Sequence, residues 1–193
     1  MSDREPTDVA RRFLVVLDVD STLIENEAIE LLAAEAGTLD HVARVTERAM
    51  RGELDFAASL RERVATLAGL PVSVFETVAP RIVVTPGVPE LVAGVHGAGG
   101  AICVVSGGFH ELLDPLAASI GLDAWHANRL EIRDGVLTGQ VEGDIVDAAA
   151  KADRLRTWAD RWHVPITRTV AIGDGANDLE MMAAANPTIT SVR

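Results

Sequence analysis

The sequence has one cysteine, Cys103, among 193 residues. A single thiol cannot form a disulfide within the chain, which favours a reducing compartment such as the cytoplasm. Its neighbours in the run AICVVS are apolar, so we expect a buried, unreactive thiol on a strand. No run reaches the ~20 apolar residues of a membrane-spanning helix, and the polar first segment lacks the apolar stretch of a signal peptide. We therefore expect a cytoplasmic protein without a membrane partner.

Positive charge is also scarce. The chain has 17 Lys and Arg residues against 29 Asp and Glu residues, a formal net charge of −12, and a pI of about 4.7. A surface of this sign repels a nucleic-acid backbone, so we expect a small-molecule substrate and no nucleic-acid partner. If that substrate is an anion, a metal ion or a few well-placed basic side chains must bind it. The sequence leaves open whether the protein is a monomer or a homodimer.

The chain contains enough apolar material for a substantial core. Apolar residues make up 48% of the sequence, and its mean hydropathy is +0.21. This composition excludes general disorder, and the length fits one domain or one domain with a small insertion. The sequence shows neither internal repeats nor low-complexity segments.

Apolar runs alternate with segments of helical spacing along most of the chain. The expected strands cover residues 12–17, 101–105 and 167–172, a hairpin with an Asp-Gly turn covers 130–141, and residues 188–192 have room for a short edge strand. The expected helices cover residues 88–96, 110–120, 147–162 and 177–185. This order predicts an α/β fold, a Rossmann-like doubly wound and mostly parallel sheet with helices on both faces.

The segment from residue 25 to residue 80 follows a different pattern. Four stretches of helical spacing follow one another there without a strand, which predicts a compact helical bundle inserted after the first strand. We therefore expect a catalytic core formed by residues 11–24 and 81–193 and a helical cap formed by residues 25–80. Residues 1–10 are expected to be disordered.

Three of the expected strands end in polar or glycine-rich sequence. These ends are DVDST at 18–22, SGG at 106–108 and GDGAND at 173–178. In an open parallel sheet, ligands bind in the crevice at the carboxyl ends of the strands. We therefore expect the three segments to face one crevice and to form the active site.

The acidic residues of this crevice predict phosphoryl chemistry. Asp18 is the expected nucleophile, and Asp20 is the expected general acid and base. Several carboxylates repel one another in a partly dry site unless a hard cation binds, and oxygen ligands with open positions favour Mg²⁺. The expected metal ligands are Asp18, Asp20 and Asp174, with Asp178 in a supporting position.

A transferred phosphoryl group also needs hydrogen-bond donors around its oxygens. The candidates are the Ser106 hydroxyl, the Gly107 backbone N–H and the Lys151 ammonium. Each motif has an ordinary alternative when taken alone. Acidic residues after a strand are often helix caps, a Ser-Gly-Gly segment is often a turn, and a lysine on a helix usually lies in solvent. The joint occurrence of the motifs, each at a strand end or on a following helix, favours the active site.

The same segments resemble the phosphatases of the haloacid dehalogenase superfamily. DVDST is similar to the first motif of that family, SGG to the second, Lys151 to the third and GDGAND to the acidic closing motif. The resemblance extends from about residue 14 to residue 182. It implies an aspartyl-phosphate intermediate, a Mg²⁺ ion and an inserted helical cap.

Within the superfamily, the strings AMRGELDFAASLRERV, VSGGF, ANRL and DGVLTG resemble the members that act on phosphoserine. The resemblance implies that Glu27 binds the substrate ammonium group and that Arg63 binds its carboxylate. It also implies that Met50 and Phe56 close over the ligand and that Asn177 contacts the substrate. Judged alone, Glu27 fits the start of a helix, Arg63 fits a surface position, and Met50 and Phe56 fit a helical core.

Two features depart from the family pattern. Val19 stands between the two aspartates of the first motif, where the family usually has phenylalanine, and the sequence after Met182 is shorter than the pattern.

The alternatives to a phosphoserine-specific enzyme are another small-monoester phosphatase or phosphotransferase of the same superfamily, an inactive shortened homologue, or a receiver-like signalling module phosphorylated on aspartate. Receiver modules are shorter, lack an inserted helical cap and carry the aspartate on a later strand.

Overall fold

A six-stranded sheet forms the centre of the computed structural model, which describes residues 10–186 and 188–190. The strand order is β4-β3-β2-β1-β5-β6, and every neighbouring pair is parallel except β3 and β4. The strands are β1 Leu14–Leu17, β2 Ala101–Phe109, β3 Ala124–Arg133, β4 Val136–Glu142, β5 Thr169–Gly173 and β6 Thr188–Thr190. The predicted doubly wound, mostly parallel sheet is confirmed.

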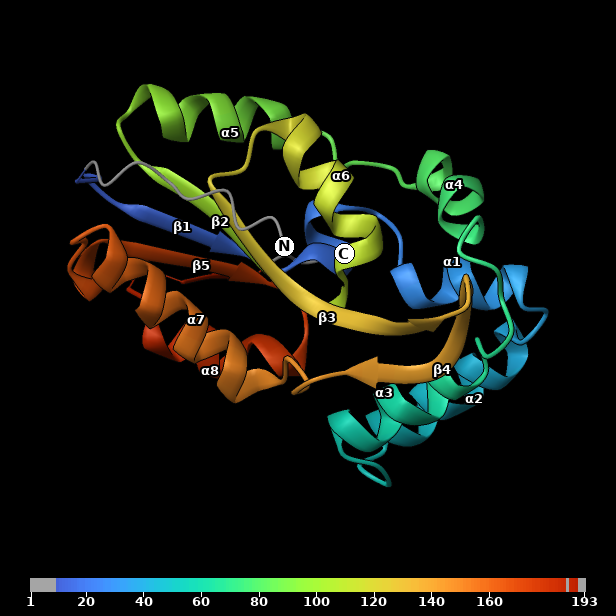
Figure 1. Cartoon of the computed structure of the whole chain (residues 1–193). Coiled ribbons are helices and arrows are strands. Elements are labelled where there is room, and N and C mark those ends of the chain that lie inside the picture. The colour runs from blue at the N-terminus through green and yellow to red at the C-terminus, as the bar shows by residue number, and fades with distance from the viewer. Residues whose placement is uncertain (1–9, 187, 191–193) are drawn as a thin grey trace.

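Helices cover both faces of this sheet, as Figure 1 shows. Helices α5 (Val88–Gly97) and α6 (His110–Ile120) lie on one face, and α7 (Ala148–Arg161) and α8 (Leu179–Ala184) lie on the other. The alternation of side chains along β1 explains this arrangement, because successive residues of a strand point to opposite faces.

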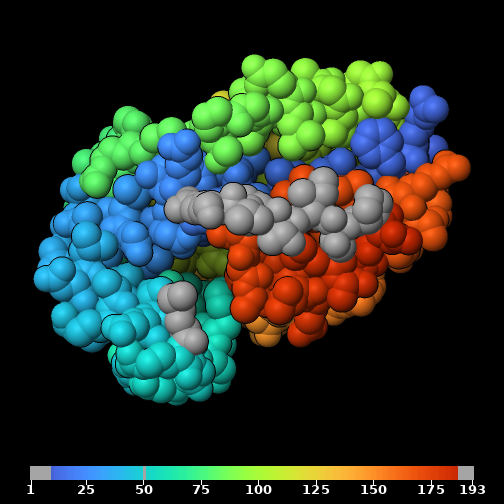
Figure 2. Space-filling view, turned by 180° about the vertical axis from the view of Figure 1, so that it is seen from behind, coloured from blue at the N-terminus to red at the C-terminus, as the bar shows by residue number. Residues whose placement is uncertain are grey.

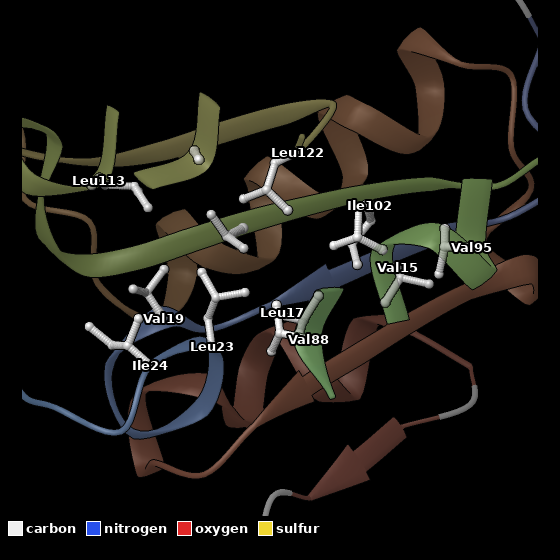
Figure 3. Close-up of a cluster of buried hydrophobic side chains, with 14 residues drawn as sticks. Val15, Leu17, Val19, Leu23, Ile24, Val88, Val95, Ile102, Leu113 and Leu122 are labelled. Carbon is white, nitrogen blue, oxygen red and sulfur yellow. The ribbon is translucent and has the colours of Figure 1, made fainter. Parts of the chain in front are cut away.

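Both faces of the central strands are therefore buried. Val15 and Leu17 pack with residues of α5 and α6 (Figure 3), whereas Leu14 and Val16 pack with residues of α7 and α8. A strand covered on both faces needs apolar residues at every position. The run LVVL meets this requirement, and it ends where the polar site begins.

The predicted helices after the first strand are present. They are α1 Ala28–Glu35, α2 Leu39–Met50, α3 Phe56–Ala65 and α4 Val74–Val78, followed by a 3-10 turn at Ala79–Arg81. Their apolar faces form a core of their own together with Phe109, Leu130 and Leu137 from β2, β3 and β4. In Figure 2 this helical segment, coloured from blue through cyan to green, lies at one end of the molecule. The helical segment therefore packs on the β3–β4 hairpin and on the end of β2.

Several boundaries differ from the sequence-based expectation. Strand β2 continues through Gly107 and Gly108 to Phe109, and β3 begins at Ala124 rather than near Leu130. The segment 124–129 runs from half-buried to buried to exposed residues without a period of two, so no alternating pattern predicted a strand there. The expected disorder of residues 1–10 concerns a segment that, apart from Ala10, lies outside the described residues. Among the described residues, no helix has the length and apolar composition to cross a membrane.

Candidate active site

Asp18 lies directly after β1, where the chain leaves the sheet in a tight turn at Val19–Leu23. Ser21 adopts a left-handed backbone conformation with φ of 59°, and this bend separates the side chains of Asp18 and Asp20. The Asp20 Oδ1 atom accepts a hydrogen bond of 2.8 Å from the backbone N–H of Ala28 at the start of α1. The positive end of the helix dipole thus faces the Asp20 carboxylate.

The buried ammonium of Lys151 joins two carboxylates. Its Nζ atom lies 2.5 Å from Asp18 Oδ1 and 2.7 Å from Asp178 Oδ1. The side chains of Lys151 and Asp178 are fully buried, and that of Asp18 is nearly so. Burial lowers the pKa of Lys151, but the charges of Asp18 and Asp178 outweigh this effect and raise it above the usual value. Lys151 is therefore a permanent cation inside the site.

Three carboxylates could share a cation. Single oxygen atoms of Asp18, Asp174 and Asp178 lie within 4.8 Å of one another. Asp174 is also within reach of the Thr22 hydroxyl, which lies 3.3 Å from its Oδ1 atom. A set of oxygen donors only, with one exposed member, suits a hard divalent cation that keeps some of its waters. The residues present therefore fit the expected metal.

The carboxylates that lie close together are not the same set as the expected metal ligands. Asp178, expected only in a supporting position, has an oxygen within the cluster. The carboxylate of Asp20, expected as a ligand, is not part of it among the described residues and instead accepts the N–H of Ala28. Periodicity and spacing could not distinguish these positions because the turn after β1 is irregular.

Close packing explains the glycines at the end of β2. A Cβ atom at Gly108 would lie 2.9 Å from Asp20 Oδ2, and one at Gly107 would lie 2.7 Å from the Phe56 ring. The Gly108 N–H donates to Ser106 Oγ over 2.8 Å, so the Ser106 hydroxyl hydrogen is left to bind another acceptor. The glycines thus let Asp20 and Phe56 approach the end of β2 beside Ser106.

A similar constraint acts at the end of β5. A Cβ atom at Gly173 would lie 2.4 Å from Asp178 Oδ2, which is closer than any real contact. The same oxygen accepts a hydrogen bond of 3.0 Å from the Gly175 N–H. The GDGAND loop therefore folds back on its own aspartate and holds that carboxylate against Lys151.

A cavity of about 160 Å³ lies between the strand ends and the helical segment. The residues that line it come from the turn after β1, from α1 and α3, from the end of β2 and from the GDGAND loop: Asp18, Asp20, Glu27, Ile29, Phe56, Leu60, Arg63, Gly107, Gly108, Phe109, Asp174, Gly175 and Asn177. A larger cavity of about 530 Å³ lies between β3 and α7. We place the site in the smaller cavity because, of the two, it contains the acidic cluster residues Asp18 and Asp174.

Two side chains of opposite charge line this cavity on the side of the helical segment. Glu27 accepts a hydrogen bond of 2.5 Å from the Ser21 hydroxyl, and the Arg63 Nε–H donates to the backbone carbonyl of Ser59 over 3.3 Å. Burial raises the pKa of Glu27 and lowers that of Arg63. A ligand that carries both an ammonium group and a carboxylate would restore the solvation that each side chain loses.

Burial also acts on the two aspartates of the first motif. It raises the pKa of Asp18 to about 6, against the opposing effect of Lys151. It raises the pKa of Asp20 to about 8, and the neighbouring charges of Glu27 and Asp18 add to this effect. A divalent cation at the acidic cluster would lower the pKa of its ligands. Without a cation, the pKa of Asp20 thus lies above neutral pH.

Most of the residues that the sequence singled out meet at this cavity. Asp18, Asp20, Glu27, Phe56, Arg63, Gly107, Asp174 and Asn177 line it, Lys151 reaches it through Asp18, and Ser106 lies beneath Gly108. The side chain of Met50 lies outside the described part of the structure. Sequence reasoning missed the contacts of Ser21 and Thr22, although both are polar residues of the DVDST motif.

Comparison with known proteins shows the family to which the chain belongs. A model of the haloacid dehalogenase-like hydrolase family matches residues 15–183, and the chain belongs to that family. Within the family, the chain is similar to phosphoserine phosphatases. It is 52% identical over 172 residues to the enzyme of Streptococcus thermophilus, covering 89% of this chain and 80% of the relative. The match to a hydrolase family argues against a receiver-like module.

Other relatives extend the likeness. The chain is also 52% identical to a phosphoserine phosphatase of Mycobacterium tuberculosis, but it spans only 42% of that protein's length. A substrate-bound phosphoserine phosphatase structure matches with a TM-score of 0.88 and 39% identity, over 93% of this chain and 86% of the other. A phospho-aspartyl intermediate analogue of a phosphoserine phosphatase matches with the same TM-score and 40% identity, over the same shares of the two chains.

Proposed function

We propose that this chain hydrolyses O-phospho-L-serine to L-serine and inorganic phosphate through a phosphoryl intermediate on Asp18. The observation that carries the proposal is a single cavity that contains Glu27 and Arg63 together with Asp18. The activity of the similar phosphoserine phosphatases supports the same substrate. The small cavity and the single buried cysteine agree with a small metabolite and with a cytoplasmic location.

Recognition of the amino-acid part follows from charge. The Arg63 guanidinium forms paired hydrogen bonds with the substrate carboxylate, and Glu27 accepts from its ammonium group. The Ser21 hydroxyl holds Glu27 by a hydrogen bond, so the carboxylate faces the ligand without a large loss of side-chain freedom. Asn177, from the GDGAND loop, contacts the substrate from the opposite side.

The first chemical step transfers the phosphoryl group to the protein. Lys151 binds Asp18 Oδ1, and the other carboxylate oxygen attacks phosphorus. A P–O bond forms to Asp18 while the bond between phosphorus and the serine oxygen breaks. Asp20 donates a proton to that leaving oxygen, which gives L-serine.

The second step releases phosphate. Asp20, now a carboxylate, takes a proton from a water molecule that attacks the aspartyl phosphate. The new P–O bond replaces the bond to Asp18, which returns to its carboxylate form. The Ser106 hydroxyl, the Gly107 N–H and the Lys151 ammonium stabilise the charge on the phosphoryl oxygens in both steps.

The acidic cluster would hold Mg²⁺ through Asp18, Asp174 and Asp178. When bound, the ion would supply positive charge that reduces the repulsion between the phosphate and the carboxylates.

We further propose that residues 25–80 act as a cap over a core of residues 11–24 and 81–193. In this arrangement Phe56, packed against Gly107, excludes water from the reaction, and Met50 is expected to assist it.

A phosphate-release assay tests the proposal. The protein is incubated with O-phospho-L-serine in Mg²⁺ or in EDTA, beside p-nitrophenyl phosphate and phosphorylated alcohols without the amino-acid group. We expect Mg²⁺-dependent release with the highest kcat/KM for phosphoserine, and no release by Asp18→Asn. Equal kcat/KM values for all esters would reject the substrate, and an active Asp18→Asn protein would reject the mechanism.

A further inference from the structure

Asn128 is a fully buried polar residue that the proposed chemistry does not use. It lies on β3 beside the end of β2, opposite Phe109, and its exposed fraction is 1%. Its Nδ2 atom donates a hydrogen bond of 2.9 Å to the Gly107 carbonyl. Its Oδ1 atom accepts one of 2.8 Å from the Val146 N–H. The two partners, one acceptor and one donor, fix the orientation of the side-chain amide.

The first of these bonds determines the direction of a peptide group in the site. In a planar trans peptide, the Gly107 carbonyl and the Gly108 N–H point in opposite directions. Because Asn128 holds the Gly107 carbonyl, the Gly108 N–H points the opposite way and donates to Ser106 Oγ over 2.8 Å. This bond occupies an oxygen lone pair of Ser106 and leaves its hydrogen for a phosphoryl oxygen.

The second bond reaches the helix that carries Lys151. Val146 precedes Asp147, whose carboxylate caps α7 by accepting the Ala150 N–H over 2.9 Å. Lys151 is the next residue, and its Nζ atom binds Asp18. The side-chain amide of Asn128 therefore connects the Ser106–Gly108 end of β2 with the start of α7, two segments that lie far apart in sequence.

We propose that Asn128 is a positioning residue. It holds the Ser106–Gly108 end of β2 and the start of α7 at the spacing required to bind a phosphoryl group. The proposal rests on the phosphatase activity proposed above, but it does not depend on which monoester is the substrate. It goes beyond that activity because Asn128 neither lines the smaller cavity nor belongs to the acidic cluster. Its effect reaches the phosphoryl group through the peptide of Gly107 and through Lys151.

A purely structural role for Asn128 predicts a different result. A buried amide that only satisfies two backbone groups contributes to stability, and its loss lowers the folded fraction without changing how the folded molecules bind phosphate. The inhibition constant of inorganic phosphate separates the two roles, because it is a property of the folded molecules alone.

The test substitutes Asn128→Asp. Ionised aspartate keeps an oxygen for the Val146 N–H but offers no donor to the Gly107 carbonyl, so the peptide loses its orientation. Because burial raises the pKa of a carboxyl group, the variant is measured at alkaline pH, which favours the ionised form. We expect kcat to fall about 10–100-fold with both phosphoserine and p-nitrophenyl phosphate, as for other residues that orient an active-site group. We also expect the inhibition constant of inorganic phosphate to rise about tenfold.

Thr169→Val is the matched control. Thr169, the first residue of β5, is equally buried and lies at the end of the strand opposite to the GDGAND loop. Its hydroxyl donates to the Ile166 carbonyl. Its loss is expected to lower the melting temperature while the inhibition constant of phosphate stays at the wild-type value. For Asn128→Asp, a folded protein with kcat and the inhibition constant within about twofold of wild type would overturn the proposal.

Two further measurements cover other outcomes. If Asn128→Asp does not fold, Asn128→Ala is measured in the same way. If both fail, nuclear magnetic resonance of the wild-type protein decides: the Asn128 side-chain signal must shift when inorganic phosphate saturates the site, and an unchanged signal overturns the proposal. A wild type that hydrolyses p-nitrophenyl phosphate but not phosphoserine rejects the proposed substrate, and the phosphate measurement on Asn128 remains valid.

Discussion

Lys151 Nζ lies 2.5 Å from Asp18 Oδ1, although 133 residues separate the two in sequence. Lys151 is also the only lysine in the chain, and its side chain has no exposed surface. Lysine is rarely buried unless it is paired, and here two carboxylates pair with it. The ammonium therefore does two things: it compensates buried negative charge, and it connects α7 to the end of β1 where we propose the reaction.

Replacement of this lysine by methionine is expected to destabilise the fold. Lys151→Met keeps most of the side-chain volume but leaves the carboxylates of Asp18 and Asp178 without their partner. Removal of one member of a buried ion pair costs about 3–5 kcal/mol. We expect a loss of that size in the free energy of unfolding, measured by urea titration in EDTA at neutral pH. A loss below about 1 kcal/mol, typical of exposed pairs, would contradict the pairing.

The pH dependence of the same variant gives an independent check. Burial already raises the pKa of Asp18 to about 6 while Lys151 lowers it, so the pKa rises further without the lysine. The folded variant then binds a proton that the unfolded chain does not bind at this pH. Its free energy of unfolding is therefore expected to increase as the pH falls from about 8 to about 6. Urea titrations across this range test the sign, and a decrease would contradict it.

Chemical modification should find two unreactive side chains. Cys103 is fully buried, and burial raises the pKa of its thiol well above the usual value. Lys151 is buried and held protonated by Asp18 and Asp178. We expect neither iodoacetamide nor acetic anhydride to modify these residues in the native protein, and both to react in urea. Peptide mapping by mass spectrometry measures this, and rapid native modification of Lys151 would contradict its burial.

Substitution of two arginines of α3 distinguishes recognition of the substrate carboxylate from a general effect of positive charge. Arg63 lines the cavity, whereas Arg61, two residues earlier, is exposed. We expect Arg63→Ala to raise KM for phosphoserine about 10–100-fold, because a charged hydrogen-bond pair is lost, and to change KM for p-nitrophenyl phosphate little. Arg61→Ala should leave both values near wild type. Equal effects of Arg63→Ala on the two esters would contradict recognition of the carboxylate.

The sequence was sufficient to predict most of the central sheet and most of the residues that meet at the cavity. LVVL followed by DVDST predicted a buried strand with an acidic end, and the structure has β1 and Asp18 there. The helical spacing after residue 25 predicted the inserted helices. These signals are strong because burial imposes a period on consecutive residues.

The remaining features depend on contacts between distant segments. The strand character of Ala124–Asn128 comes from pairing with β2, and no local pattern revealed it. The position of Asp20 outside the acidic cluster depends on the N–H of Ala28, eight residues later. The amide of Asn128 between Gly107 and Val146 depends on the meeting of three segments. Such relationships require the assembled fold.

The contact of Gly107 with Phe56 predicts a steric effect on the closed site. The backbone of Gly107 does not need a positive φ, so alanine fits the strand conformation. Its Cβ atom, however, would lie 2.7 Å from the Phe56 ring, and the ring must move away from the site. We expect Gly107→Ala to lower kcat/KM about tenfold or more, because displaced closing residues admit water and shift the substrate.

Two companion variants make this prediction specific. Gly94→Ala on α5 has open space around the added Cβ, so it should raise the free energy of unfolding by about 0.5–1 kcal/mol and leave kcat/KM unchanged. Phe56→Leu shortens the side chain that the methyl group added by Gly107→Ala would meet. In the double variant, the loss in kcat/KM should therefore be smaller than the sum of the single losses in free-energy terms. Strictly additive losses would mean that the two residues act independently, and the proposed exclusion of water by Phe56 packed against Gly107 would be wrong.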